Sequence, residues 1–198
     1  DVLCFWNMHF DIITIMNRLR QLGANPEKEF TPKDFGKWCL ADYNEDTYHT
    51  EPTENDDVFN CTAYTIYADQ MLLYASLRKT SGKKESYSLD YTLQSELNET
   101  KYRYEGHLRD LAYRDYASFC IYGGIDVVPM AALEASIEDI ALFYQLSMIT
   151  RTRFHNVMSK TPCLRNLAAV FYRDQYLILS YNRNKNKERT DSEKFRGA

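Results

Sequence analysis

The sequence predicts an all-α or mainly α-helical fold, a bundle of about five or six helices, and three observations point to it. Glycine and proline are scarce, at 7 and 5 of the 198 residues, so the chain lacks the frequent turns of a β-sandwich. Apolar residues recur every three or four positions along most of the chain, which is the period of a helix. A chain of this length also buries roughly 70% of its unfolded surface, enough for a stable core.

Two helices are predicted in the first part of the chain. Residues 3–22 have the helical spacing of apolar side chains, and Gly23 follows as a stop signal. Thr31 and Pro32 form a typical helix start, because threonine caps the first amides and proline fits the first helical position. We expect this second helix to continue to about residue 43.

Three longer segments provide the body of the expected bundle. Residues 58–78 are apolar on most faces, which predicts a buried central helix. Residues 95–122 carry one apolar stripe with charged residues opposite, and Gly123-Gly124 is expected to end that helix. Pro129 then starts another helix with a broad apolar face.

The remaining segments complete the predicted domain. Residues 85–93 alternate between apolar and polar, the period of a strand, which predicts a small β-hairpin there. Thr161-Pro162 repeats the helix-start signal and opens the last helix. From residue 182 onward the chain has no apolar face. We therefore expect a single helical domain over residues 1–182 and a basic, disordered tail over residues 183–198.

The cysteines and the hydropathy pattern bear on the compartment. The five cysteines are scattered, and no two have the C-x-x-C spacing, so neither a disulfide framework nor a zinc site is expected. Reduced thiols favour a cytoplasmic or nuclear location, although N-x-[ST] triplets at Asn60 and Asn98 would suit secretion. No apolar run approaches the ~20 residues that a membrane span requires.

The charges are distributed unevenly along the chain. Residues 151–198 hold 11 Lys or Arg against 4 Asp or Glu, whereas the remaining residues hold 13 against 24. Clustered basic side chains neutralise phosphates, which predicts nucleic-acid binding through residues 151–196. The alternatives are a solubilising tail or a tail that folds back onto the acidic loop. The candidate contact residues are Arg151, Arg153, Lys160, Arg165, Arg173, Arg183, Lys185, Lys187 and Arg189.

The acidic loop, residues 42–57, contains a partial calcium-binding pattern. Asp42, Asn44 and Asp46 match the D-x-N-x-D opening of a loop in which oxygen ligands converge on Ca²⁺ between two helices. Thr47 stands where the sharp turn requires glycine, and Thr53 stands where a bidentate glutamate belongs. A solvated loop without a metal is the alternative, and no other cofactor is expected.

No pattern in the sequence assigns a catalytic residue. The chain has no phosphate-binding glycine loop and no H-E-x-x-H spacing. Three functions remain open. The first is a non-enzymatic interaction or regulatory protein that contacts a protein partner, or itself, through helix faces. The second is a nucleic-acid-binding protein, a regulator or a viral-type packaging protein. The third is an enzyme whose site the sequence does not reveal.

Overall fold

The computed structural model describes residues 1–102, 104 and 106–175. These residues form four strands, eight α-helices and three 3₁₀ helices: β1 (Val2–Phe5), α1 (Met8–Gln21), α2 (Pro26–Phe30), η1 (Lys33–Phe35), β2 (Ala41–Asn44), β3 (Val58–Cys61), β4 (Ile66–Asp69), α3 (Gln70–Leu77), η2 (Lys79–Ser81), α4 (Leu89–Leu97), α5 (Leu108–Arg114), α6 (Tyr116–Ile137), α7 (Asp139–Thr150), η3 (Phe154–Met158) and α8 (Lys160–Asp174).

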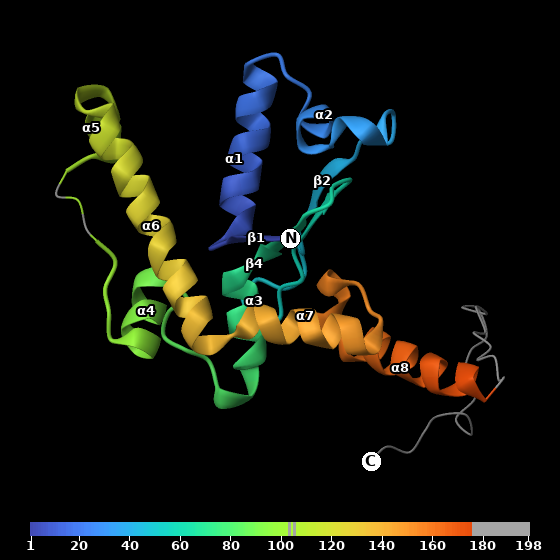
Figure 1. Ribbon diagram of the computed structural model, residues 1–198. Coiled ribbons are helices and arrows are strands. Elements are labelled where there is room, and N and C mark those ends of the chain that lie inside the picture. The colour runs from blue at the N-terminus through green and yellow to red at the C-terminus, as the bar shows by residue number, and fades with distance from the viewer. Residues whose placement is uncertain (103, 105, 176–198) are drawn as a thin grey trace.

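The fold is mainly helical, as the sequence predicts, but it has more helices than the five or six expected and two small sheets. Strands β1 and β4 pair in parallel, with Val2 opposite Ile66, and β2 and β3 pair antiparallel. Helices α1, α6 and α8 point outward in different directions from the β1–β4 sheet and its neighbours, rather than lying side by side as in a bundle (Figure 1). The expected basic tail, residues 183–198, lies outside the described residues.

Three separate clusters of buried side chains replace the single core of a bundle. The first joins α1 to the β2–β3 hairpin, the second joins β4 and α3 to α7 and η3, and the third joins α4 to α6. The β1–β4 sheet lies between the first two clusters, since Phe5 and Tyr67 pack on the first while Val2 and Ile66 pack on the second. Both faces of this sheet are therefore covered, as parallel sheets generally are.

The hairpin predicted at residues 85–93 is wrong, because a helix begins there. The Ser88 hydroxyl accepts a hydrogen bond from the Tyr91 amide at 3.3 Å and caps α4. Leu89 and Leu93, four residues apart, are both buried on the same helix face. The alternating pattern was compatible with either period, and the serine cap with this leucine pair favours the helix.

Three predicted helices are shorter than expected because strands or a loop occupy part of their range. Residues 3–22 begin with β1, and residues 58–78 contain β3 and β4 before α3. Only the short η1 forms within residues 32–43, and β2 follows it. Short apolar runs cannot distinguish a buried strand from a helix by periodicity, which explains these errors.

The expected helix over residues 95–122 is also divided differently. Helix α4 ends at Leu97, a loop follows, and α5 precedes α6. Gly123 and Gly124 do not stop α6, which continues through Pro129 to Ile137. Neither glycine adopts a positive φ, so neither provides the left-handed turn that ends a helix.

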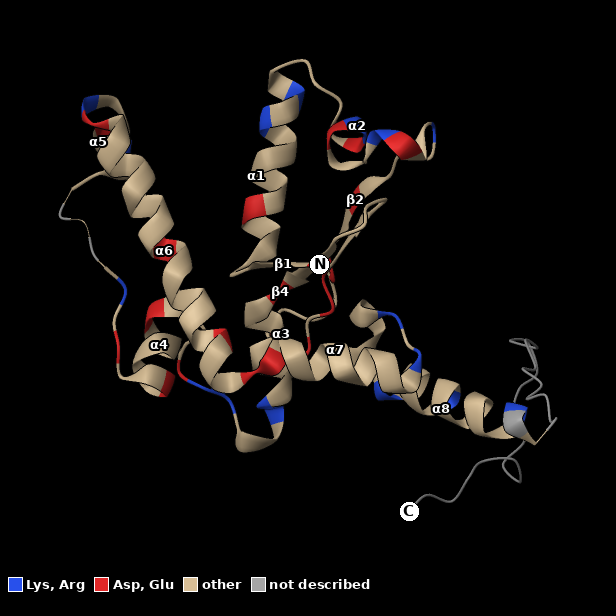
Figure 2. Cartoon of the chain, viewed as in Figure 1, with Lys and Arg blue, Asp and Glu red and all other residues tan. Residues whose placement is uncertain are grey.

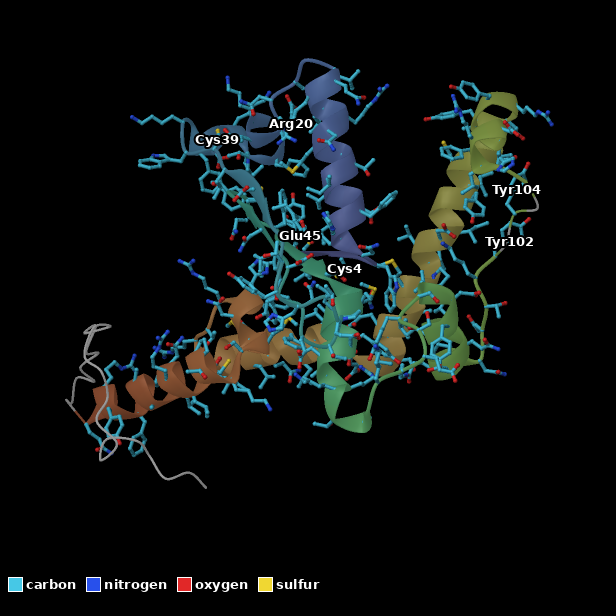
Figure 3. The ribbon with its side chains drawn as sticks, turned by 180° about the vertical axis from the view of Figure 1, so that it is seen from behind. Cys4, Arg20, Cys39, Glu45, Tyr102 and Tyr104 are labelled. Atoms are coloured by element: carbon cyan, nitrogen blue, oxygen red, sulfur yellow. The ribbon has the colours of Figure 1, made fainter. Side chains whose placement is uncertain are left out.

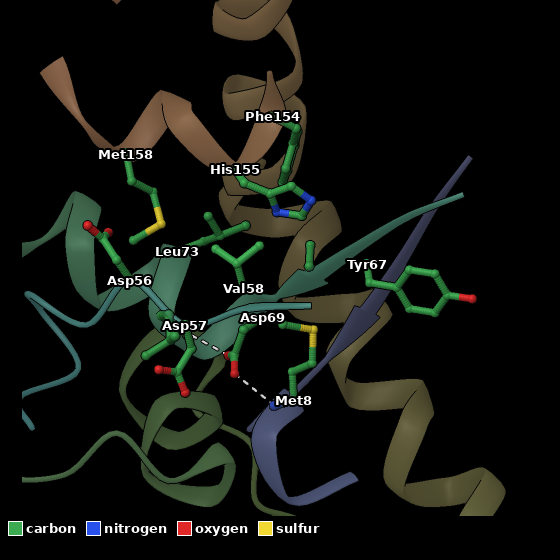
Figure 4. A pocket seen from close by; sticks show the side chains of 12 residues that line it. Met8, Asp56, Asp57, Val58, Tyr67, Asp69, Leu73, Phe154, His155 and Met158 are labelled. Carbon is green, nitrogen blue, oxygen red and sulfur yellow. Dashed lines mark hydrogen bonds between the residues drawn. The ribbon is translucent and has the colours of Figure 1, made fainter. Parts of the chain in front are cut away.

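One buried carboxylate fixes the starting points of two helices. Asp69, the last residue of β4, is 6% exposed. Its Oδ2 accepts a hydrogen bond from the Met8 amide at 2.7 Å, and its Oδ1 accepts one from the Leu72 amide at 3.1 Å (Figure 4). Asp69 thus caps α3, which follows it, and α1, which lies 61 residues earlier. Asn7, the residue before α1, has φ 71° and caps nothing with its own side chain.

A charged cluster fixes the other end of α3. The Arg78 guanidinium binds Asp139 at 2.6 Å and lies over the Tyr74 ring, 4.0 Å from its centroid. Lys84 pairs with Glu96 at 2.9 Å, and the Tyr74 hydroxyl bonds to both of them. Because these residues come from α3, α4, α7 and the segment between α3 and α4, the cluster links all three helices.

The double cap predicts an unusually large effect of removing Asp69. Asp69→Ala leaves two buried helix starts without their acceptor and is expected to lower the free energy of unfolding by about 2 to 4 kcal/mol. Asp115→Ala is the matched control, because the exposed Asp115 caps only α6, through the Ser118 amide at 3.1 Å. We expect about 1 kcal/mol for the control in urea unfolding. Equal losses in the two variants would contradict the double role.

The ionisation of Asp69 predicts a pH dependence of stability. Burial raises the pKa of Asp69 to about 6, against a model-peptide value of 3.8, despite four backbone amides that favour the charged form. The folded state therefore binds the proton more tightly, and the stability that Asp69 contributes is full below about pH 4 and falls as the pH rises to about 6. Relative to Asp69→Asn, the wild-type free energy of unfolding should decline by about 3 kcal/mol over this range. If the free energy of unfolding of the wild type instead rises relative to Asp69→Asn as the pH increases, this prediction is wrong.

Candidate nucleic-acid interface

The basic segment predicted to bind nucleic acid forms a rigid corner between α7 and α8. Arg151 ends α7 with φ 52°, and the chain turns there into η3. The side-chain amide of Asn166, on α8, donates to the Arg151 carbonyl at 3.2 Å and to the Thr152 hydroxyl at 3.1 Å. These bonds tie the turn to the next helix and fix the backbone of the corner.

Apolar packing holds η3 beneath this corner. Phe154 and Val157 are buried, and the Phe154 ring lies 6.2 Å from that of Phe143 on α7. The Cys163 thiol donates to the Val157 carbonyl at 3.6 Å, which places α8 against η3. Phe154 and Val157 face inward, and the Arg and Lys side chains of the segment face the solvent.

Five of the predicted contact residues lie on this corner and along α8, and all five are exposed: Arg151, Arg153, Lys160, Arg165 and Arg173. We call this set the basic arm; Figure 2 shows its blue positions around η3 and along α8. No acidic side chain among the described residues forms an ion pair with the first four. The other predicted residues, Arg183, Lys185, Lys187 and Arg189, lie outside the described part of the chain.

The acidic loop is held by other lysines. Lys79 binds Glu54 at 2.7 Å, and Lys83 binds Glu51 at 2.7 Å, so the loop is docked onto η2 and the turn that follows it. These pairs are largely exposed and contribute little to stability. They nevertheless show which cations the acidic loop contacts within the described residues.

The structure places the predicted calcium ligands differently from the expected helix–loop–helix. Asp42 and Asn44 lie on the exposed face of β2. Asp46 accepts hydrogen bonds from three amides of its own loop and contacts His49 Nδ1 at 2.7 Å; its pKa is lowered to about 2, first by that histidine. Within the described ranges, no group of three His, Cys, Asp or Glu side chains is arranged to hold a metal ion. Calcium binding remains a prediction that this geometry does not support.

A small pocket beside Asp69 gathers groups that the sequence did not single out. His155, Asp56, Asp57 and Asp69 line it, together with apolar residues of β4, α3 and η3 (Figure 4). Burial lowers the pKa of His155, so its ring is neutral at physiological pH. The cavity measures about 20 Å³, which is room for a single water molecule. The pocket therefore belongs to the packing around Asp69 and is too small for a substrate.

A groove lined by tyrosines lies beside α6, on the side of the molecule away from α8 (Figure 3). Tyr102, Tyr104 and Tyr122 line it with aliphatic residues of α5 and α6, around a volume of about 290 Å³. The rings of Tyr102 and Tyr122 are 6.2 Å apart, and Figure 3 shows Tyr102 and Tyr104 on the segment that runs beside α6. We call this the tyrosine groove. Sequence reasoning missed it because its residues are separated by a loop and a whole helix.

The expectation that no apolar segment approaches the length of a membrane span does not hold for helix α6. By length and composition it is the one helix among the described residues that could cross a membrane. However, Asp126 on α6 binds Lys101 at 2.9 Å, and Glu134 caps α7 through the Ile140 amide at 3.0 Å. Both acidic residues of α6 therefore bind other parts of the chain.

Comparison with characterised proteins finds a polymerase. Over 162 residues the chain is 25% identical to the DNA-directed DNA polymerase of Escherichia phage RB69. The similar region is 80% of this chain but only 16% of the polymerase, so the chain corresponds to a small part of that protein's length. No protein-family model matches the chain.

Proposed function

We propose that this chain is a DNA-binding part of a polymerase-like protein. The observation that carries the proposal is the similarity to a DNA-directed DNA polymerase along 80% of the chain. That name describes an enzyme that acts on DNA, and the similarity to part of it supports DNA as the proposed partner of this chain. Nucleic-acid binding is one of the three functions that the sequence leaves open. Here it is proposed for part of an enzyme, not for a regulator or a packaging protein.

The basic arm supplies the electrostatic part of the proposed binding. Its side chains are exposed and sit on a corner fixed by the Asn166 hydrogen bonds. Arginine and lysine on such a surface contact phosphate oxygens, which positions DNA without reading its sequence. We therefore propose salt-sensitive binding with little sequence preference at this surface.

The tyrosine groove supplies a place for unpaired bases. Aromatic rings on a surface stack with bases of any sequence, each stacked base contributing about 1 to 3 kcal/mol. Tyr102 is 57% exposed and Tyr104 37% exposed, so both rings are accessible. The two surfaces thus predict separate effects. The basic arm should set how strongly binding depends on salt, and the tyrosine groove should set the preference for single-stranded over double-stranded DNA.

The basic arm is tested by removing three charges. Arg153→Gln/Lys160→Gln/Arg165→Gln should weaken DNA binding in a fluorescence anisotropy titration and reduce the slope of log K against log salt by about 3. The matched control is Arg18→Gln/Arg20→Gln/Lys28→Gln, which removes the same charge from exposed positions on α1 and α2. Equal weakening in both variants would show that binding depends only on the net charge of the protein and not on the basic arm.

The tyrosine groove is tested with single-stranded and double-stranded oligonucleotides of the same sequence. Tyr102→Ala/Tyr122→Ala should weaken single-stranded binding by tenfold or more, with the salt slope unchanged, because stacking involves no counterion release. Tyr113→Ala is the control, since this ring is 80% exposed but does not line the groove. A loss that is the same for both kinds of DNA would contradict base stacking.

A second candidate function, contact with a protein partner or self-association through helix faces, is supported by α6. Only Leu133 of its 22 residues is buried, and Ile121, Val127 and Val128 are each more than 60% exposed. An apolar surface of this kind marks an interaction site in a folded protein. Sedimentation of the chain from low to high concentration tests self-association. If the chain stays monomeric at every concentration, the partner must be a different protein.

A further inference from the structure

A polar pocket lies at α2 and the segment that follows this helix. It measures about 570 Å³, which is within the size range of pockets that bind small molecules. Residues from 25–29 provide one part of its lining, and residues from 31–39 provide the other. Figure 2 shows both basic and acidic positions along this part of the chain. We call it the lysine pocket, and its charged lining residues are Glu27, Lys28, Glu29, Lys33 and Lys37.

The charged side chains of the lysine pocket are not paired with one another. The three lysines are exposed, and none of them forms an ion pair within the described part of the chain. Glu27 and Glu29 line the same pocket, and neither binds a described Lys or Arg. Donors and acceptors of both charges are therefore available to a molecule that enters the pocket.

A buried hydroxyl in the lining of the pocket also lacks a partner. Thr31 lines the pocket and is only 6% exposed, and its Oγ1 forms no hydrogen bond with any described residue. A buried polar group without a partner is costly, and folded proteins nearly always satisfy such a group with protein atoms, water or an ion. Since the described residues supply no partner for this hydroxyl, a molecule in the pocket can supply one.

We propose that the lysine pocket binds a nucleoside monophosphate, whose phosphate is held by Lys33, Lys37 and the Thr31 hydroxyl. Lysine ammonium groups form charge-assisted hydrogen bonds with phosphate oxygens, and a threonine hydroxyl can donate a further one. The pocket is larger than a phosphate group needs. The carboxylates of Glu27 and Glu29 accept hydrogen bonds from donors elsewhere on the ligand, such as a sugar hydroxyl or a base amine.

An exposed aromatic ring beside the pocket favours a nucleoside over a simple sugar phosphate. Trp38 stands in the chain between Lys37 and Cys39, which both line the pocket, and it is 75% exposed. An exposed indole is a surface on which a base of any kind can stack. The pocket contains no residue of the basic arm or of the tyrosine groove, so the proposal can succeed or fail independently of the proposed function.

The test titrates the full chain with deoxyadenosine monophosphate and follows its backbone amides by NMR. We expect saturable shifts concentrated in residues 25–39. Deoxyadenosine without the phosphate should bind at least about tenfold more weakly, because it lacks the charge-assisted hydrogen bonds. Inorganic phosphate should also bind more weakly than the nucleotide, because it lacks the base and the sugar. The proposal is overturned if the nucleotide causes no saturable shifts there, or if inorganic phosphate binds as tightly as the nucleotide.

Thr31 variants test the unpartnered hydroxyl. Thr31→Val removes the hydroxyl with little change of shape and should weaken nucleotide binding by about tenfold. The same variant should not lower the free energy of unfolding in urea, because the hydroxyl has no partner in the protein to lose. Thr31→Ser retains the hydroxyl and should bind like the wild type. If Thr31→Val binds the nucleotide as tightly as the wild type, water satisfies the hydroxyl and the proposed contact is wrong.

Lysine variants separate a free nucleotide from a DNA strand as the ligand. Lys33→Gln/Lys37→Gln should weaken nucleotide binding and leave oligonucleotide affinity unchanged, since the basic arm remains intact. Lys79→Gln/Lys83→Gln is the matched control, because it removes two exposed lysines that do not line the pocket, and it should bind the nucleotide normally. Equal weakening by the control overturns the proposal. A parallel loss of oligonucleotide affinity in Lys33→Gln/Lys37→Gln would assign these lysines to DNA and overturn a separate nucleotide site.

Discussion

The arrangement of the whole molecule depends on the carboxylate of Asp69. Its two oxygens accept from the Met8 and Leu72 amides, in the first turns of α1 and α3, so a single side chain at the end of β4 caps both helices. Helix α1 then lies with the β2–β3 hairpin on one side of the β1–β4 sheet, and α3 leads to the helices on the other side (Figure 1). A carboxylate in this position must be buried to reach both helices, and burial is the reason that its pKa is raised.

The Arg78 cluster connects α3 to the helix that carries the basic arm. Arg78 at the end of α3 binds Asp139 at the start of α7, and α7 ends in the corner from which the basic arm extends. The opposite route, from α3 through Tyr74 and Glu96 to α4, leads to α6 and the tyrosine groove. The two surfaces of the proposed function therefore lie at the ends of two branches that meet at α3.

The sequence predicted those features that depend on local chemistry. The mainly helical fold followed from the helical spacing of the apolar residues. Features that depend on distant contacts were missed. Residues 85–93 alternate like a strand, whereas the burial of Leu89 and Leu93 against α6 shows that the fold uses the helical period. Asp69 appeared to be an ordinary residue inside a helix, because its bond to Met8 crosses 61 positions. The tyrosine groove likewise requires a loop to lie against α6, which no local pattern encodes.

Mapping where DNA touches the chain tests most directly whether the basic arm and the tyrosine groove bind it. A single-stranded oligonucleotide containing 5-iododeoxyuridine is cross-linked to the protein by light, and the attached peptides are identified by mass spectrometry. We expect cross-links in residues 102–122, where the tyrosines can stack on the modified base, and in residues 151–173 of the basic arm. Cross-links confined to α1, α2 and the acidic loop, or no cross-links at low salt, would contradict this expectation.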